Sequence, residues 1–457
     1  MRLLRRRSRP KVPGRPPASA RAVRRTALTA VALLGVAAVC GAGVLDPGAT
    51  LDKTTADDAR DLLPPEILKH YRNGDYRNAV VDFPNSRWKW DDGFDAATRW
   101  NAEHLVLDEH KSPVDKTTGK RPDYITGLPF PDIRDDDPDA GAKILWNVDY
   151  AYYTGGNSRN LVLLSWVSRS GQDRSAVQDV RFLYYDGQPR KYAPASNPEN
   201  FLFQFLALSI SPADLQGTAA LGHRYKDPTK RDANWAYVPA LRRVRAVSPA
   251  NRSDGFLGSD TSQDDGFFFD GKPEDFTWKV VGHRDGLRIV DPDSIAGKVV
   301  RHPLPGGGWR TISTNNDRAA GFQVKGWPGV AWAPVAAGVA RRRFWILEGV
   351  PKDKYYLYGR LELWVDDYTW QGAWNRKFSW QGELLNTYQV TGFATAPFNE
   401  HESWWGATFA MEVSENVKGD RATVAGLNGP GAEPPNDRRL PLDPVFFDYQ
   451  TLNRFGK

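Results

Sequence analysis

Hydrophobic and polar residues alternate most regularly in the stretch from Asp232 to Gly282. Trp235 to Val238 shows the two-residue period of a strand with one apolar face. Pro239 has a fixed φ and no N–H, so it ends that strand and opens a turn. Arg242 to Val247 alternates again and is the predicted return strand. The pattern predicts a β-hairpin with three arginines close to its bend.

A third strand is predicted from Phe276 to Val281, and it carries Trp278. Before it come two turn sequences, Asp254-Gly255 and Gly258-Ser259-Asp260, placed around the apolar pair Phe256-Leu257. The stretch is therefore predicted to be β-sheet with an unusual concentration of arginine at one bend.

Strand signals dominate the chain from Tyr124 onward. Short apolar runs are separated by Gly, Asn and Asp turns, which favours an antiparallel meander over alternating strands and helices. Strands resume between Arg341 and Thr391, with Asp366-Asp367 as a turn, after a loop-rich region from Thr311 to Pro334. The earlier predicted strands are Ile144–Tyr153, Leu161–Ser168, Asp179–Tyr185, Phe201–Ile210 and Thr218–Tyr225.

Helical signals are few. Leu62 to Tyr71 predicts a short helix with prolines in its first turn. From Ser86 to Leu107 aromatic and charged residues mix, and the pattern does not separate helix from strand. The tail after Lys418 is rich in Gly, Pro and Asn and is predicted to be largely irregular. The predicted fold class is therefore mainly β (α+β).

Charge excludes one class of function. The chain has 457 residues and a net charge of +6. Residues 1–42 hold ten of the 61 Lys and Arg residues and no acid, so 51 basic groups face 55 acidic groups in the rest. Binding to a phosphate backbone depends on a positive field, which the body of the chain lacks. We therefore expect no nucleic-acid partner.

Residues 1–45 are predicted to be a signal peptide or an N-terminal anchor. A basic region precedes Thr26 to Leu45, which contains twenty uncharged residues. That length also suffices to span a bilayer, so an uncleaved anchor stays open. Cys40 is the single cysteine; Val39 before it disfavours lipidation, and we interpret Cys40 as a small apolar residue of this segment. The predicted location is the periplasm or cell envelope, with outer-membrane association as a further option.

Four sequence features resemble one family. The run W-x-Y-x-P-A-L-R-R-V-R from Trp235 is followed by G-S-D and W-K-x-V-G, and matching stretches are Gly127–Asn147, Ser211–Tyr237 and Tyr356–Trp370. Over roughly residues 60 to 450 the chain resembles bacterial envelope proteins of unknown function, a family described as similar to outer-membrane lipoprotein-sorting proteins of the LolA/LolB type.

The resemblance implies a fold more firmly than an activity. It implies one large domain, residues 46–457, built on a curved, incompletely closed antiparallel β-sheet (a half-barrel) with a few helices covering its concave side. A groove between such a sheet and its helices can shield an acyl chain from water.

The arginine cluster can be interpreted in two ways. Guanidinium groups form forked hydrogen bonds to phosphate or carboxylate, which suits a lipid headgroup or an acidic partner. Alternatively the arginines form structural ion pairs with acidic residues that follow closely in the sequence, namely Asp254, Asp260, Asp264 and Asp265. Alternation predicts Arg243 and Arg245 on one face of the sheet and Arg242 on the other.

Aromatic residues are the second candidate for binding. The chain contains 17 Trp, and such side chains can line an acyl-chain cavity, stack on sugars, or fill a large β core. The candidate ligand-binding residues predicted from sequence are Trp235, Tyr237, Arg242, Arg243, Arg245, Asp254, Asp260 and Trp278.

Catalytic signals are poor. The seven His residues show no metal-ligand spacing, and no nucleophilic serine motif or phosphate-binding loop stands out. We therefore predict no catalytic residue, no metal and no cofactor.

Three functions stay open. The first is a non-enzymatic carrier or binding protein for a lipid or lipoprotein acyl chain in the cell envelope. It would contact the membrane transiently or through its N-terminal segment, and export or outer-membrane proteins are possible partners. The second is a structural or adaptor protein of an envelope export machine, with its core filled by its own side chains. The third is a glycan-acting enzyme. The size and lining of any cavity distinguish them.

Overall fold

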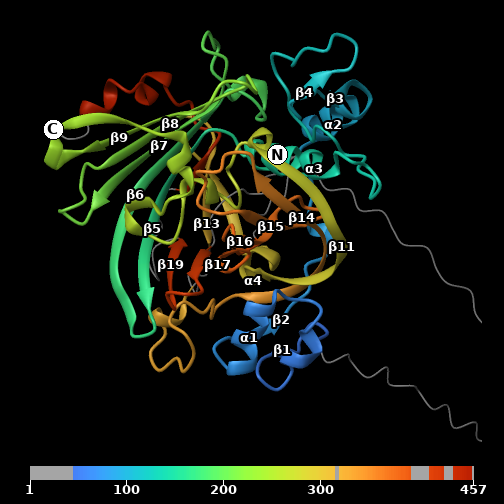
Figure 1. Cartoon of the computed structure of the whole chain (residues 1–457), viewed down its shortest axis with the longest axis vertical. Coiled ribbons are helices and arrows are strands. Elements are labelled where there is room, and N and C mark those ends of the chain that lie inside the picture. Colours follow the sequence, from blue (N-terminus) through green and yellow to red (C-terminus); the bar gives the residue numbers. More distant parts are fainter. Residues whose placement is uncertain (1–44, 314–318, 393–410, 427–435, 455–457) are drawn as a thin grey trace, which may run out of the picture. The chain divides into compact units, whose positions relative to one another are not determined.

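The computed structural model describes residues 45–313, 319–392, 411–426 and 436–454 (Figure 1). Cys40 and all but the last residue of the predicted export segment lie outside the described residues. In the described part of the chain, no helix is long and apolar enough to cross a membrane.

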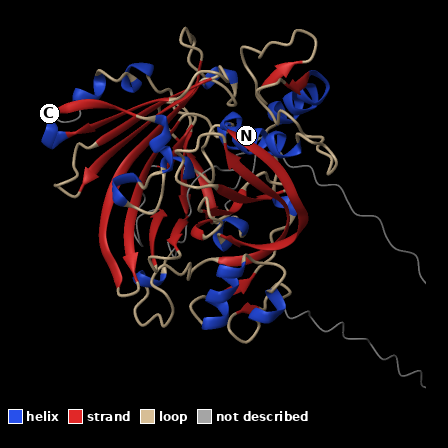
Figure 2. Cartoon of the chain, viewed as in Figure 1, coloured by secondary structure: helices blue, strands red, loops and turns tan. Residues whose placement is uncertain are grey.

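The described residues form mainly strands, and most strands belong to one sheet (Figure 2). The four α-helices of the described residues are α1 (Pro65–Asn73), α2 (Asp92–His104), α3 (Ala140–Tyr153) and α4 (Pro292–Ile295).

The sheet is an antiparallel ladder with two arms that meet between β5 and β19. The first arm contains, from its edge inward, β10 (Arg243–Val247), β9 (Ala233–Val238), β8 (Ala219–Tyr225), β7 (Phe201–Ser211), β6 (Gly171–Tyr184) and β5 (Ser158–Ser168). The second arm continues with β19 (Arg421–Gly426), β18 (Met411–Asn416), β17 (Leu384–Val390), β16 (Gly372–Phe378), β15 (Arg360–Asp366), β14 (Gly338–Pro351) and β11 (Phe276–Val290).

Short strands extend this ladder. β20 (Asn436–Arg438) pairs with the start of β5. β13 (Trp309–Ser313) pairs with β20, and β12 (Val299–Pro303) pairs with β13. β2 (Asn78–Val80) pairs in parallel with the start of β14, and β1 (Thr50–Leu51) pairs with β2. A separate ribbon pairs β3 (Leu105–Leu107) with β4 (Pro113–Asp115). Among the described strands the edges β10 and β11 do not pair with each other, so the sheet is open. The predicted fold class, a large and incompletely closed β-sheet with few helices, is confirmed.

Alternation along the strands assigns each side chain to one of two faces. We call the face that carries Val162, Leu164, Phe182 and Phe205 the inner face, and the opposite one the outer face. Cross-strand partners share a face, so the register extends this assignment through both arms. On the second arm Leu347, Leu363 and Tyr388 fall on the inner face.

Different parts of the chain cover the two faces. On the outer face, α1 and residues 319–339 pack against the second arm in one apolar cluster. The first arm is covered there by the C-terminal 3₁₀ helices Pro444–Phe447 and Thr451–Arg454, through Phe447 and Leu452. Helix α3 packs on the inner face of both arms.

One prediction about secondary structure is wrong. Ile144–Tyr153, predicted as a strand, belongs to α3, where every residue except Lys143 and Tyr152 is buried. A helix buried all round is apolar all round, so its sequence lacks the period that separates helix from strand. The tail after Lys418, predicted to be largely irregular, contributes Arg421–Gly426 to the sheet as β19.

Other predictions are confirmed. The hairpin is present as β9, a 3₁₀ turn at Pro239–Leu241 and β10. The predicted strands at 161–168, 179–185, 201–210 and 218–225 lie in β5 to β8, apart from a residue at their ends. The undecided stretch 86–107 contains α2 and β3.

Helix α3 approaches β11 closely because it carries a glycine at the contact. A Cβ placed on Gly141 would lie 2.8 Å from Trp278 Cβ and 3.1 Å from the Trp278 carbonyl carbon. Buried Asn147 holds the same helix, since its Oδ1 accepts from Phe130 N at 2.9 Å and its Nδ2 donates to Phe130 O at 2.7 Å.

We therefore predict that Gly141→Ala destabilises the fold. Helix propensity alone favours Ala over Gly by about 1 kcal/mol, but a contact of this kind displaces α3 from β11 and overpacking costs about 1–3 kcal/mol. Urea unfolding should show a net loss of stability. Gly93→Ala in α2 is the matched control, because a Cβ at Gly93 would meet nothing within 4 Å, and it should leave stability equal or higher. Equal effects of the two changes would contradict the close contact.

Candidate functional site

The connection between β10 and β11, residues 248–275, lies against the inner face; we call it the inner segment. It consists of short 3₁₀ helices and turns. Gly, Pro and Asp are frequent in it, and these residues favour turns over strands. Its backbone polar groups therefore need partners from the surrounding sheet.

Asp260 supplies several of these contacts on the second arm. Its backbone N donates to Thr423 Oγ1 at 2.9 Å, and its backbone O accepts from Asn386 Nδ2 at 3.2 Å. The carboxylate accepts from Asn416 Nδ2 at 3.0 Å and from the Arg421 guanidinium at 3.1–3.2 Å. One residue thus joins the inner segment to β17, β18 and β19.

The inner segment is also tied to the first arm. Gln263 Nε2 donates to Asn234 Oδ1 on β9 at 3.0 Å. Further along, Asn375 Nδ2 on β16 donates to Phe268 O at 2.9 Å. The segment therefore bridges the two arms across the inner face.

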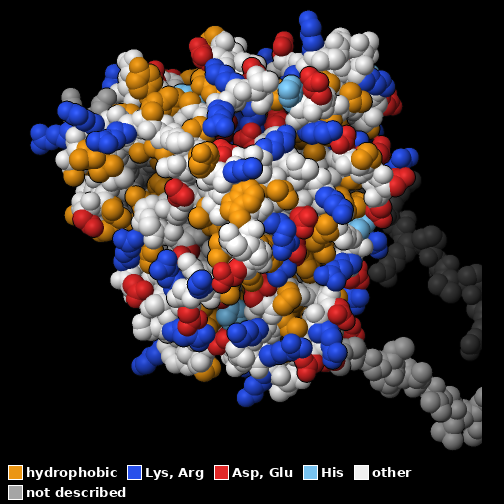
Figure 3. Space-filling view, in the orientation of Figure 1, with side chains coloured by type: hydrophobic (Ala, Val, Ile, Leu, Met, Phe, Trp, Pro, Cys, Tyr) orange, Lys and Arg blue, Asp and Glu red, His pale blue; other side chains and the backbone are white. Residues whose placement is uncertain are grey.

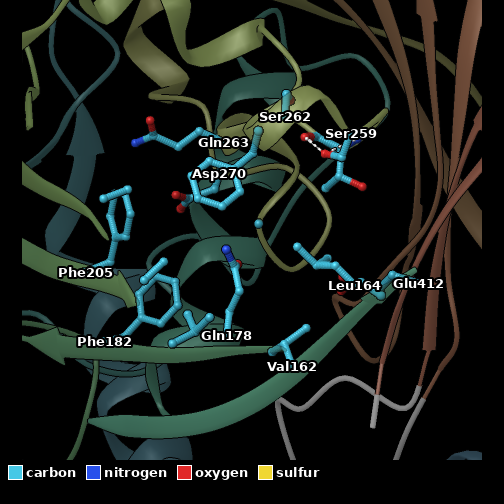
Figure 4. A pocket seen from close by; sticks show the side chains of 17 residues that line it. Val162, Leu164, Gln178, Phe182, Phe205, Ser259, Ser262, Gln263, Asp270 and Glu412 are labelled. Carbon is cyan, nitrogen blue, oxygen red and sulfur yellow. Dashed lines mark hydrogen bonds between the residues drawn. The ribbon is translucent and has the colours of Figure 1, made fainter. Parts of the chain in front are cut away.

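Between the inner segment and the first arm lies a cavity of about 140 Å³. Figure 4 shows the side chains of both walls facing one another across it. Apolar atoms make up most of its surface. The sheet contributes Val162, Leu164, Gln178, Val180, Phe182, Phe205, Ala207, Ala220, Glu412 and Ala425, and the inner segment contributes Phe256, Ser259, Thr261, Ser262, Gln263, Gly266 and Asp270.

Two buried carboxyl groups border this cavity. Burial raises the pKa of Asp270 to about 6, although the neighbouring Arg224 and Arg252 lower it. Burial also holds the pKa of Glu412 well above its usual range, against a hydrogen bond from Tyr388 that lowers it. Burial thus favours the protonated form of Glu412, whereas Asp270, with a pKa of about 6 beside Arg224 and Arg252, loses its proton between about pH 5 and pH 7.

A second pocket of about 460 Å³ is lined by residues from both ends of the inner segment and from its middle, and most of its lining residues are charged. Its buried cations already have protein partners. Arg252 Nη1 and Nε donate to Asp232 Oδ2 at 2.8 Å and Asp264 Oδ1 at 2.5 Å. Lys272 Nζ donates to three backbone carbonyls at 2.8–3.2 Å. We therefore attribute these charges to the fold, and take the apolar cavity as the candidate site.

The aromatic residues predicted as ligand contacts lie away from this cavity. Trp235 and Tyr237 are on the outer face of β9, where Trp235 stacks on Tyr449 with ring centroids 5.7 Å apart and Tyr237 is buried in the cluster with Phe447. Trp278 is on the inner face of the second arm, and its Nε1 donates to Pro273 O at 2.9 Å. None of the three lines the cavity.

The predicted arginine cluster divides differently from expectation. Arg243 and Arg245 lie on the inner side of β10, opposite Val238 and Ala236, and both are exposed. Arg242 is not on the strand but in the turn before it, with a left-handed backbone at φ 47°. Within the described residues the three guanidinium groups form no ion pair.

The acidic residues proposed as their partners bond elsewhere. Asp260 pairs with Arg421, Asp264 with Arg252, and Asp265 with Lys377. Asp254 is exposed, outside the cavity lining. Asp260, predicted as a ligand contact or a partner of the arginine cluster, instead anchors the inner segment to β17, β18 and β19.

Sequence reasoning missed the cavity lining on β5 to β8. The signal was available, because Val162 and Leu164, Val180 and Phe182, and Phe205 and Ala207 each lie two residues apart within predicted strands. What the pattern lacked was the identity of the segment that covers them.

One protein-family model matches the chain. The model for "Protein of unknown function (DUF1329)" matches residues 50–451. No curated protein matches the sequence.

Three solved structures are similar to the chain. A domain described as that of an outer membrane lipoprotein-sorting protein from Vibrio parahaemolyticus shares 16% identity, with a TM-score of 0.44, and the match covers 70% of this chain and 100% of that one. A DUF1329 family protein from Desulfovibrio piger shares 16% identity, with a TM-score of 0.43 and coverage of 69% and 99%. A LolA superfamily protein from Nitrosomonas europaea shares 11% identity, with a TM-score of 0.37 and coverage of 66% and 95%.

We predict that Asp260→Ala destabilises the fold by about 1.5–3 kcal/mol, the usual worth of hydrogen bonds to a charged group. The Asp260 side chain is only 5% exposed, so Asn416 loses a partner that water replaces poorly. Denaturant unfolding measures the change. Asp214→Ala, at an exposed position, is the control and should stay within about 0.5 kcal/mol of the parent. Equal unfolding of both variants would refute the anchoring role.

The titration of Asp270 should also change how the stability of the fold depends on pH. Its pKa is about 6 in the folded chain against 3.8 for a free carboxyl, so the folded state binds the proton more strongly between these values. Its contribution to stability is therefore complete below about pH 4 and is lost as the pH rises through about 6.

Asp270→Asn removes this titration. The unfolding free energy of the variant relative to the parent should therefore rise between about pH 4 and pH 7. Urea unfolding at several pH values tests this, with Asp214→Asn as the control. Parallel profiles for parent and Asp270→Asn would show that Asp270 does not titrate in this range.

Proposed function

The chain belongs to the DUF1329 family of proteins of unknown function, as its motifs predicted, and from this premise we propose that it is a non-enzymatic binding protein for an acyl chain of a lipid or lipoprotein. The observation that carries the proposal is the apolar cavity between β5–β8 and the inner segment. Apolar lining favours a hydrocarbon occupant, since burial of apolar surface is the main favourable term in such binding.

The size of the cavity limits what it can hold. At about 140 Å³ it is close to cavities of about 150 Å³ that take up benzene, so it accommodates roughly six carbon atoms. At about 0.8 kcal/mol for each buried CH₂, roughly six of them contribute about 5 kcal/mol before ordering costs. That corresponds to a Kd on the order of 0.1–1 mM. The described cavity is therefore suited to the end of a chain, and tight binding needs further contacts.

A second function has one observation in its favour. The inner segment occupies much of the inner face and is bonded to both arms, which fits an adaptor protein whose core is filled by its own side chains. The apolar cavity that remains favours the binding protein over the adaptor.

We place this function in the cell envelope. The support is the basic region and the uncharged stretch Thr26 to Leu45 at the N-terminus. Contact with the membrane would be transient or would run through that segment.

Filling the cavity tests the proposal. Ala220 lines the cavity on β8 and is only half-buried, so Ala220→Phe adds a ring to the cavity at low cost to the fold. We expect at least about tenfold weaker binding of the neutral fluorescent probe N-phenylnaphthylamine, whose phenyl ring has the size of the cavity, because the new side chain takes the volume that this ring needs. Fluorescence titration of the purified full chain measures it.

The matched control is Ala246→Phe. Ala246 is exposed on the outer face of β10, so the same change there should leave probe binding unaltered. The proposed function would be contradicted if the parent and Ala220→Phe bound the probe equally tightly, or if the parent did not bind it at all.

A further inference from the structure

We infer that the ligand is an anionic amphiphile, with its apolar chain in the cavity and its phosphate or carboxylate headgroup bound by Arg243 and Arg245. The inference rests on the proposed function and adds the class of ligand. It uses two observations that the cavity alone does not explain. A row of small residues leads away from the cavity, and two guanidinium groups without an ion-pair partner among the described residues lie where that row ends.

The row follows from the register of the first arm. Ala207 on β7 is opposite Ala220 on β8, Ala220 is opposite Ala236 on β9, and Ala236 is opposite Arg245 on β10. All four residues therefore lie on the inner face. Ala207 and Ala220 line the cavity, while Ala220 and Ala236 are partly exposed. Three successive alanines keep this part of the inner face shallow and apolar, and they form a path from the cavity to the sheet edge.

The length of the path suits one molecule. Neighbouring strands lie about 4.8 Å apart, so β10 is about 10 Å from β8 across the sheet. An amphiphile whose chain end occupies the cavity can cover this distance with the remainder of its chain. Its headgroup then reaches Arg245, and Arg243 two residues along the same face.

The arginines at the end of the path differ from most other arginines that the structure describes. Arg252 and Arg224 share Asp232, and Arg159 and Arg181 share Asp179. In contrast, Arg243 and Arg245 are exposed and form no ion pair with any described residue. A guanidinium group presents a planar fork of donors that matches phosphate and carboxylate.

Edge protection is the competing explanation. Charged side chains on an edge strand discourage pairing with other chains, and β10 is an edge among the described strands. Protection requires charge but no particular face. The two arginines share the inner face with the alanine row, and Figure 3 shows basic and hydrophobic side chains side by side over the region that Figure 1 labels β9. The shared face and the neighbouring basic and hydrophobic side chains both favour a headgroup site.

The test compares three probes on the purified full chain by isothermal titration calorimetry, below the concentration at which micelles form. The probes are dodecyl phosphate, neutral dodecylglycerol and inorganic phosphate. The parent is compared with Arg243→Gln/Arg245→Gln and with Arg60→Gln/Arg77→Gln. Arg60 and Arg77 are exposed and lie on either side of α1 in the sequence, so this control removes the same charge elsewhere.

We expect the parent to bind dodecyl phosphate at least about tenfold more tightly than dodecylglycerol, the fold-change of one charge-assisted hydrogen bond. Arg243→Gln/Arg245→Gln should abolish this preference and leave dodecylglycerol binding unchanged, and the control variant should behave as the parent. Added salt should weaken only dodecyl phosphate binding, because the arginines are exposed and their attraction is screened.

Different failures have different meanings. Parent-like binding of dodecyl phosphate by Arg243→Gln/Arg245→Gln, with both amphiphiles bound, overturns the headgroup site and leaves the proposed function standing. Inorganic phosphate bound as tightly as dodecyl phosphate overturns the amphiphile in favour of a free anion. If the parent binds neither amphiphile, the proposed function fails and this inference fails with it. Equal melting temperatures of parent and variants establish that the comparison concerns folded protein.

Discussion

The inner face of this open sheet is largely apolar and needs a cover, and the rest of the structure depends on how residues 248–275 provide it. The inner segment has little regular secondary structure, so its polar groups must find partners in the sheet. It also carries charge into the interior. Arg252 donates to Asp232 and Asp264, and Arg224 donates to the same Asp232 at 2.9–3.0 Å. Buried charges are tolerated only when paired, so each of these contacts restricts where the segment can lie.

Much of the strand content could be predicted from the sequence because short apolar runs are separated by turn residues. The hairpin of β9 and β10 and the runs β5 to β8 carry that signal. Helix α3 could not be predicted, because its contacts on every side remove the periodic pattern. Arg242 was misplaced for a local reason: the 3₁₀ turn at Pro239–Leu241 ends in a left-handed residue, so the strand begins one residue later.

The candidate site was harder to predict than the fold, because alternation tells which residues share a face but not which face is inner. Trp235 and Tyr237 do share a face, as predicted, yet it is the one covered by the C-terminal helices near Phe447. The covering segments are distant in sequence, and no local pattern connects them to the strands. The register of β9 and β10 places Arg243 and Arg245 on the opposite face, which is the side of the cavity.

The position of β19 has a consequence for how the chain folds. Strands β5 to β10 are consecutive in sequence, and so are β14 to β18, but the two groups meet only where Arg421–Gly426 pairs with β5 on one side and β18 on the other. The contact between Arg421 and Ser168 therefore closes a very long loop, and contacts of this range form slowly. Each arm can assemble as soon as its own strands have been synthesised, but their union awaits nearly the last part of the chain. During folding, two incomplete sheets with unpaired edges therefore precede the complete one, and the pairing of β19 with β5 is the step that commits the molecule to its native topology.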